Sequence, residues 1–218
     1  MQEGVVLLHG IFRTSISMRS LHRFLLKQGF KVCNIDYASR RFTLQELAEH
    51  IHPVVADFSG KVEKVHFVGH SMGGLLTRAY LNTCRPENLG KVVMLGTPNK
   101  GSEVADKLQR WWIFRELYGP AGQQLITDQS GVMQVLGTVN YDVGIIAGNR
   151  TIDPIGSYII GIENDGKVSV ESTKLPGMKA HRIVPVSHTF LPDTRQVQEL
   201  VVEFIKTGQM TNQASAST

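Results

Sequence analysis

The sequence has no long hydrophobic run, so it predicts no transmembrane helix. Its first residues lack the basic start and the extended apolar stretch of a secretory signal, and we expect a cytoplasmic protein unless the chain is already processed. Only two cysteines occur, Cys33 and Cys84, which is too few for a disulfide framework. We interpret both as reduced packing residues.

Charge of one sign is not concentrated anywhere. The formal net charge of +4 is spread along the chain, and no basic arm or patch with interleaved aromatic residues is present, so nucleic acid is not an expected partner. A mild preference for acidic substrates or anionic surfaces stays open beside the plainer interpretation, a solvated basic surface.

Motifs for metals and phosphates are also missing. No cluster of histidine, cysteine and aspartate has zinc-site spacing, and no glycine-rich loop of the phosphate-binding kind occurs. We therefore expect neither a metal nor an organic cofactor. The 218 residues, of which 42% are hydrophobic, suffice for one well-buried domain. We expect residues 1–207 to form that domain and the small polar residues 208–218 to form a disordered tail.

What is present is an alternation of apolar strands and amphipathic helices. Strands are predicted at residues 4–8, 31–36, 64–68, 91–95, 141–147 and 181–186, and helices at 16–27, 43–58, 73–83 and 194–206. We expect Thr43 and Glu46 to form a capping box and Asp193 to cap the last helix. Such alternation, with continuous apolar runs in the strands, predicts an α/β fold whose parallel sheet of about six strands carries helices on both faces.

Residues 99–140 interrupt this alternation. They contain no clear strand but both tryptophans, Trp111 and Trp112. We interpret the segment as a small helical cap or lid that covers the active site; an ordinary helix packed on the core is the alternative. Trp111, Trp112 and Phe12 are the candidate substrate-binding residues.

The segment Gly69-His70-Ser71-Met72-Gly73 lies between a predicted strand and a predicted helix. A Gly-x-Ser-x-Gly motif in that context is typical of a nucleophile elbow, in which a sharp turn exposes the serine hydroxyl. The predicted helix follows the serine directly, and the amino end of a helix favours negative charge. In a chain with 21 glycines such a motif arises by chance on the order of one time in ten. Ser71 is therefore a candidate nucleophile only if the rest of the chain supplies its partners.

The first partner is an oxyanion hole. His9-Gly10 ends the first predicted strand, and in a doubly wound sheet the first and third strands can be neighbours. The amides of Ile11 and Met72 are then placed to hold a tetrahedral oxyanion. A simple strand-ending turn is the alternative interpretation of His9-Gly10.

The second partner is a base. Of eight histidines, His188 is the best candidate, because it follows the last strand on the side where strand ends gather. His181 begins the same strand and is expected at the opposite edge of the sheet. His9 and His70 are expected to organise the turns, and the others are interpreted as surface or core residues: His22, His50, His52 and His66.

The third partner is an acid between the fifth strand and the base, since such folds run in the order serine, acid, histidine. Asp165, in the turn Asn164-Asp165-Gly166, fits that position. Asp153, Glu163 and Glu171 are alternatives, and Asp153 is the most serious because it follows the fifth strand closely. A plain turn is the other interpretation of this Asn-Asp-Gly segment.

Five segments in this order resemble the α/β-hydrolase superfamily, and more narrowly its bacterial triacylglycerol lipase and lipase-like esterase branch. They are Leu7-Leu8-His9-Gly10-Ile11, Gly69-His70-Ser71-Met72-Gly73-Gly74, Gly96-Thr97-Pro98-Asn99-Lys100-Gly101-Ser102, Asn164-Asp165-Gly166-Lys167-Val168 and Ser187-His188. The resemblance covers about residues 4–206. It implies that Ser71, Asp165 and His188 are nucleophile, acid and base, and that Ile11 and Met72 supply the oxyanion amides. The short cap and the missing signal favour an intracellular esterase over a secreted lipase.

The function expected from the sequence is therefore a serine carboxylic ester hydrolase that works through an acyl-enzyme. Its substrates are expected to be small-molecule or lipid-like esters with apolar acyl groups. A thioesterase or an acyltransferase with the same triad is the alternative, because the acceptor is chosen by pocket shape. A catalytically silent binding scaffold is a third interpretation, which the presence of serine, histidine and oxyanion turn disfavours.

Overall fold

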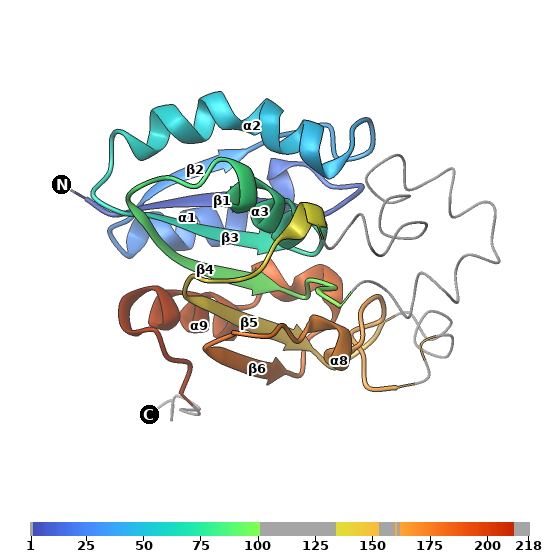
Figure 1. Cartoon of the computed structure of the whole chain (residues 1–218). Helices are drawn as coiled ribbons and strands as arrows, with labels where there is room; N and C mark the ends of the chain where they lie inside the picture. The colour runs from blue at the N-terminus through green and yellow to red at the C-terminus, as the bar shows by residue number, and fades with distance from the viewer. Residues whose placement is uncertain (1, 101–133, 153–159, 161, 212–218) are drawn as a thin grey trace.

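The computed structural model describes residues 2–100, 134–152, 160 and 162–211. Its sheet has six strands, all paired in parallel, in the order β2-β1-β3-β4-β5-β6 (Figure 1). The strands are β1 Gly4–Leu8, β2 Lys31–Ile35, β3 Val65–His70, β4 Leu89–Leu95, β5 Val143–Gly148 and β6 Ala180–Val184. The parallel six-stranded sheet predicted from the sequence is confirmed.

Helices cover both faces of this sheet (Figure 1). The described helices are η1 Ser15–Met18, α1 Arg19–Lys27, α2 Leu44–Ser59, α3 Met72–Thr83, α8 Val170–Thr173, η2 His188–Asp193 and α9 Arg195–Thr207. Within β1, Val6 and Leu8 pack with α2 and α3, whereas Val5 and Leu7 pack with α1 and α9. Because both sides of the strand are buried, its sequence is continuously apolar.

The strand order reverses between β1 and β3. From β1 the chain adds β2 on one side, and β3 then pairs with β1 on the other side. In open parallel sheets the crevice at the carboxyl ends of two such strands is the usual ligand site. Leu8 at the end of β1 stands beside Gly69 at the start of the elbow, so the expected neighbourhood of these two segments is confirmed.

Of the two helix caps predicted from the sequence, the capping box at α2 is present and the cap by Asp193 is not. At α2, Thr43 Oγ1 accepts from the Glu46 amide at 3.2 Å and the Thr43 amide donates to Glu46 Oε2 at 2.7 Å, so the predicted capping box is confirmed. The predicted cap by Asp193 is wrong. Asp193 is the last residue of η2, and the extended residue before α9 is Thr194. The 3₁₀ turn thus moves the start of α9 one residue further along.

The predicted tail also begins too early. Gly208 ends α9 in the left-handed conformation, and the residues after it bond back to the domain. Arg182 Nη2 donates to the Met210 carbonyl at 3.0 Å, and Thr211 Oγ1 donates to Glu203 at 2.6 Å. The folded domain therefore includes residues 208–211, while 212–218 lie outside the described residues. Most of the predicted cap, residues 101–133 with Trp111 and Trp112, lies outside them as well.

Both described chain ends lie at the amino edge of the sheet (Figure 1). The Gln2 carbonyl accepts from the Glu63 amide just before β3, and a Cβ built on Gly144 in β5 would lie 2.6 Å from Met210 Cε. Cys33 and Cys84 are free thiols. Of the helices that the structure describes, none has the length and apolar character needed to span a bilayer.

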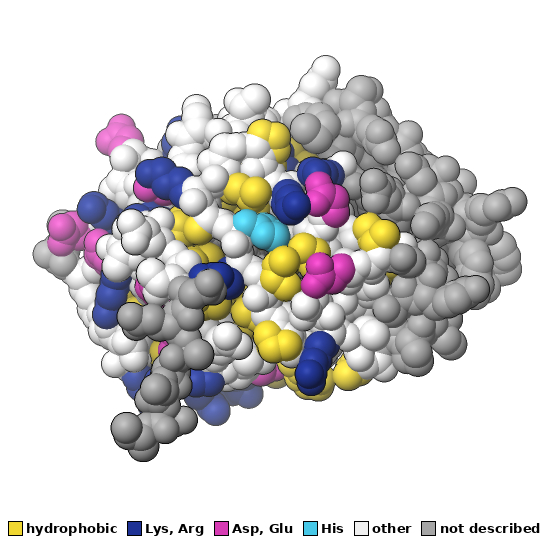
Figure 2. Space-filling view, turned by 90° about the horizontal axis from the view of Figure 1, so that it is seen from below, with side chains coloured by type: hydrophobic (Ala, Val, Ile, Leu, Met, Phe, Trp, Pro, Cys, Tyr) yellow, Lys and Arg dark blue, Asp and Glu magenta, His cyan; other side chains and the backbone are white. Residues whose placement is uncertain are grey.

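The face beyond β6 shows how charge is distributed. Figure 2 shows Lys and Arg side chains there interspersed with Asp and Glu and with small hydrophobic areas. Lys179 pairs with Asp142 and Arg195 with Glu199, each at 2.7 Å. Basic charge is thus not gathered into a nucleic-acid-binding patch on this face.

Candidate active site

Ser71 occupies a sharp turn between β3 and α3. Its backbone has φ 54° and ψ −122°, a positive-φ conformation that is strained for a residue other than glycine and costs about 1–3 kcal/mol. Three hydrogen bonds hold the turn: the Ser71 amide donates to the Leu95 carbonyl at 2.8 Å, and the Ser71 carbonyl accepts from the Gly74 amide and from Thr97 Oγ1, each at 3.0 Å. Strain at one serine, kept by surrounding bonds, is typical of a functional residue.

The glycines of the motif are required by close contacts rather than by their own torsions. A Cβ atom on Gly69 would lie 2.4 Å from the Gly74 amide nitrogen, and one on Gly73 would lie 2.2 Å from the Leu8 carbonyl oxygen. A Cβ on Gly74 would lie 2.0 Å from Thr97 Oγ1. The elbow therefore packs against the end of β1 with no room for a methyl group.

Gly73→Ala is expected to lower the free energy of unfolding by about 3 kcal/mol or more, because the new methyl group meets main chain that cannot move aside. Urea unfolding followed by circular dichroism measures the change. Gly60→Ala is the matched control. Gly60 has φ −65°, and a Cβ atom there would lie 3.7 Å from its nearest neighbours, the carbonyl oxygens of Ala56 and Asp57. The free energy of unfolding of this variant should therefore rise by up to about 1 kcal/mol. Equal stability of the Gly73 and Gly60 variants would contradict the packing described for the elbow.

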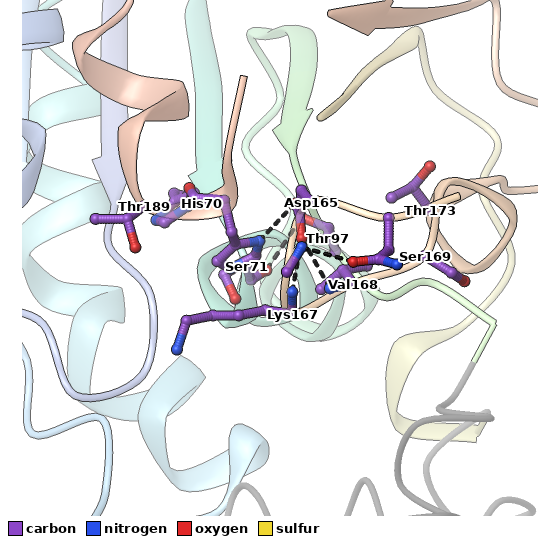
Figure 3. A network of polar contacts seen from close by, with 12 residues as sticks. His70, Ser71, Thr97, Asp165, Lys167, Val168, Ser169, Thr173 and Thr189 are labelled. Carbon is purple, nitrogen blue, oxygen red and sulfur yellow. Dashed lines mark hydrogen bonds and ion pairs between the residues drawn. The ribbon is translucent and has the colours of Figure 1, made fainter. Parts of the chain in front are cut away.

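His188 and Asp165 form a buried pair. His188 Nδ1 and Asp165 Oδ2 are 2.7 Å apart, and the His188 amide donates to the Asp165 carbonyl at 3.0 Å. The other carboxylate oxygen of Asp165 accepts from the amides of Lys167 at 3.0 Å and Val168 at 2.8 Å (Figure 3). Because the carboxylate can only accept, His188 Nδ1 carries the proton and Nε2 is left as an acceptor.

This pair lies over the end of β4. Gly96, with φ 56°, follows that strand, and a Cβ on it would lie 3.0 Å from His188 Nδ1 and 3.1 Å from Asp165 Oδ2. The adjacent Leu95 carbonyl accepts from the Ser71 amide. Ser71, His188 and Asp165 thus gather at one edge of the sheet. Among the described residues no hydrogen bond joins the Ser71 hydroxyl to His188; such catalytic bonds are often long before substrate binds.

The expected oxyanion residues lie beside the serine. A Cβ on Gly10 would lie 3.2 Å from Ser71 Cβ, so the turn after β1 contacts the elbow. Within the described structure, no hydrogen bond engages the amide of Ile11 or that of Met72. Phe12 also has a left-handed backbone, with φ 59°, and is 42% exposed with the Arg40 guanidinium 4.7 Å from its ring centroid.

The turn before Phe12 is held by His9 and Tyr37. Their rings stack with centroids 4.0 Å apart, and the Tyr37 hydroxyl donates to the His9 carbonyl. His9 Nδ1 lies 2.8 Å from the Gly10 carbonyl, and burial lowers the pKa of His9. A neutral His9 therefore shapes the turn, which agrees with its expected role.

The rival residues have other partners. His181, at the amino end of β6, bonds Thr173 Oγ1 at 2.8 Å. Glu163 accepts from Asn149 Nδ2 at 2.8 Å. Glu171 pairs with Lys100 and Lys174, whose hydrogen bonds lower its pKa to about 2. Asp153 lies outside the described residues.

Arg78 is a buried charged residue that the sequence interpretation missed. It is fully buried in α3, where its guanidinium donates to the Asn99 carbonyl at 3.2 Å, to Asn99 Oδ1 at 3.3 Å and to the Gly137 carbonyl at 3.1 Å. Asn99 in turn donates to the Thr173 carbonyl at 2.8 Å. The only sequence signal was a single arginine on the otherwise apolar stretch of α3. In the described ranges no three histidine, cysteine or carboxylate side chains are grouped to hold a metal ion.

Comparison with known proteins identifies a family and several relatives. A model of the family described as palmitoyl protein thioesterase matches residues 4–137, more than half of the chain. The bovine lysosomal thioesterase PPT2 is 28% identical over 134 residues, which cover 55% of this chain and 44% of the relative. A triacylglycerol lipase of Burkholderia plantarii is 37% identical over 65 residues, 30% of this chain and 17% of the lipase. The matched region thus spans less than half the length of these relatives.

Solved structures resemble the whole fold. Lipase BlEst2 of Bacillus licheniformis in its mature form superposes with a TM-score of 0.73 at 19% identity, covering 95% of this chain and 92% of the lipase. Its propeptide form gives a TM-score of 0.78 at 19% identity, over 99% and 52% of the two chains. The fold is therefore an α/β-hydrolase fold, as the sequence resemblance implied.

Proposed function

The chain belongs to the palmitoyl protein thioesterase family, and on this premise we propose that it is a serine hydrolase that cleaves carboxylic esters through an acyl-enzyme. One observation carries the proposal. The strained turn at Ser71 lies at the same edge of the sheet as the His188–Asp165 pair, in which His188 Nε2 is left to accept a proton. The family match and the lipase relatives support the same chemistry.

In the proposed mechanism, Ser71 Oγ attacks the substrate carbonyl carbon while His188 Nε2 accepts the hydroxyl proton. Asp165 keeps the His188 proton on Nδ1 through the 2.7 Å contact and stabilises the imidazolium that forms. The amides of Ile11 and Met72 hold the oxyanion, each contributing about 3 kcal/mol to the transition state. His188 then protonates the leaving group. In the second half of the reaction, His188 accepts a proton from the water that attacks the acyl-serine and returns it to Ser71 Oγ as the acid is released.

We propose substrates with apolar, lipid-like acyl groups. The relatives are named as a thioesterase and triacylglycerol lipases, and Phe12 exposes an aromatic ring directly after the proposed oxyanion residue Ile11. Thioester hydrolysis is the second candidate function, favoured by the family match over residues 4–137. The same triad serves both, because a thiolate leaves without needing strong protonation.

Matched pairs of esters and thioesters with acyl chains of two to sixteen carbons test both functions and rank them by kcat/KM. We expect hydrolysis of both bond types, with kcat/KM rising by about tenfold for every two methylene groups that enter an apolar site. A fluorophosphonate should label Ser71, located by mass spectrometry of the digested protein. The proposed function is wrong if the wild type cleaves no member of either series and Ser71 stays unlabelled.

A further inference from the structure

His70, the residue before the proposed nucleophile, is the last residue of β3 and is only 3% exposed. Its Nε2 lies 2.9 Å from the His188 carbonyl oxygen. A carbonyl can only accept, so His70 carries its proton on Nε2 and donates to His188. Burial holds the pKa of His70 well below its ordinary value, so the ring is neutral and keeps Nδ1 as a bare acceptor.

Three hydrogen bonds hold His188, two with Asp165 and one with His70. Its amide and its Nδ1 both bond Asp165, and these two bonds tie the base to the acid turn. Its carbonyl bonds His70, which is adjacent to Ser71 in the chain. Of the described hydrogen bonds to His188, only the one from His70 ties the base to the strand that carries the serine. Without it the His188–Asp165 pair keeps its own bonds, but none of the described hydrogen bonds links His188 to the segment that carries Ser71.

The His70 ring also lies beside the turn after β1, which precedes the proposed oxyanion residue Ile11. Its centroid is 4.9 Å from that of the His188 ring, and a Cβ built on Gly10 would lie 3.3 Å from His70 Nδ1. The imidazole therefore lies between the turn after β1 and the loop of the base. Its Nδ1 is buried with no hydrogen-bond partner in the described part of the chain, a state that costs about 1–3 kcal/mol. An apolar side chain would fill the same space without that cost.

We propose that His70 is a positioning residue, which sets the distance between Ser71 and His188 through its bond to the His188 carbonyl. The inference rests on the proposed hydrolase function and deepens it. His70 neither transfers a proton nor touches substrate. Its effect is on the alignment of nucleophile and base, where a displacement of about 1 Å costs on the order of 100-fold in rate.

Three substitutions at His70 test this role. His70→Leu and the unbranched His70→Met remove the donor, and we expect kcat to fall by about 10- to 100-fold while KM stays within about twofold. His70→Gln places an amide donor near the position of Nε2 and should recover kcat to within about fivefold of the wild type. The rate of Ser71 labelling by a fluorophosphonate should follow the same order.

His66→Leu is the matched control. His66 is another buried histidine of β3, but it lies at the amino half, where its Nδ1 accepts from the Lys91 amide at 2.9 Å. We expect this variant to lose stability while keeping the wild-type kcat. In proton NMR spectra the low-field signal of the His188 Nδ1 proton should persist in His66→Leu, His70→Gln and His70→Leu, because each variant keeps the bond between His188 Nδ1 and Asp165.

The outcomes separate the two proposals. The inference is overturned if the apolar His70 variants keep kcat, if His70→Gln is no better than His70→Leu, or if His66→Leu loses as much activity. A wild type that hydrolyses nothing overturns the proposed function instead. In that case the NMR signal still tests the inference, because loss of the low-field proton in His70→Leu would mean that His70 holds the His188–Asp165 pair together instead of setting its position relative to Ser71.

Discussion

Ser71→Ala is expected to lower kcat by about 10⁶-fold, the largest single effect in this protein, because no other group replaces the attacking oxygen. The substitution keeps Cβ and the three hydrogen bonds that hold the turn, which use main-chain atoms of Ser71. The fall in kcat is measured as ester hydrolysed over a fixed time at high protein concentration. Labelling of the protein by a fluorophosphonate should disappear in the same variant. Residual activity within tenfold of the wild type would mean that Ser71 is not the nucleophile.

Ser71→Gly separates this loss from a change in fold. Glycine adopts φ 54° without strain, so we expect the Gly variant to be more stable than the wild type by about 1 kcal/mol while equally inactive. Thermal or urea unfolding of the wild type, Ser71→Ala and Ser71→Gly provides the comparison. A Gly variant that is less stable than the Ala variant would show that the turn is not strained at Ser71.

Asp165→Asn is expected to lower kcat by about 10⁴-fold with little change in stability. The asparagine carbonyl oxygen can still accept from the amides of Lys167 and Val168, so its NH₂ group faces His188 Nδ1. That donor forces the His188 proton onto Nε2, where it blocks proton transfer from Ser71. Steady-state kinetics of purified variants measure the effect.

The other acids provide the controls for this assignment. Glu163→Gln and Glu171→Gln alter carboxylates that bond Asn149 and two lysines, and both variants should keep kcat within about threefold of the wild type. Asp153→Asn completes the set, because Asp153 was the strongest rival in the sequence. If Asp153→Asn loses activity and Asp165→Asn keeps it, the acid has been assigned to the wrong residue.

The framework of the fold was predictable because its signals are local. Strands buried on both faces are continuously apolar, as in Val5–Leu8, and the Thr43–Glu46 capping box is a four-residue pattern. Boundaries that depend on neighbouring elements were not predictable in the same way. Asp193 reads as a helix cap until the 3₁₀ turn before it is known, and residues 208–211 are held by bonds to β6 and α9 that no local pattern encodes.

The candidate site divides along the same line. Ser71, Asp165 and His188 each follow a strand, so the topology alone predicts that they share an edge of the sheet. The buried hydrogen bonds of Arg78 and the bond from His70 to the His188 carbonyl join residues 21 to 118 positions apart. These contacts depend on how loops fold over the strand ends, which periodicity and motif spacing do not determine. The catalytic roles themselves stay predictions until the variants above are measured.

The position of the chain ends has a practical consequence. Gln2 and Met210 are both held at the amino edge of the sheet, whereas Ser71 directly follows the carboxyl end of β3. A label or linker attached next to Gln2 or Met210 is therefore separated from Ser71 by the length of the strands. Protein tethered through a residue next to Gln2 or Met210 should turn the edge of the sheet that carries Ser71 toward the solution, which suits attachment to beads or electrodes.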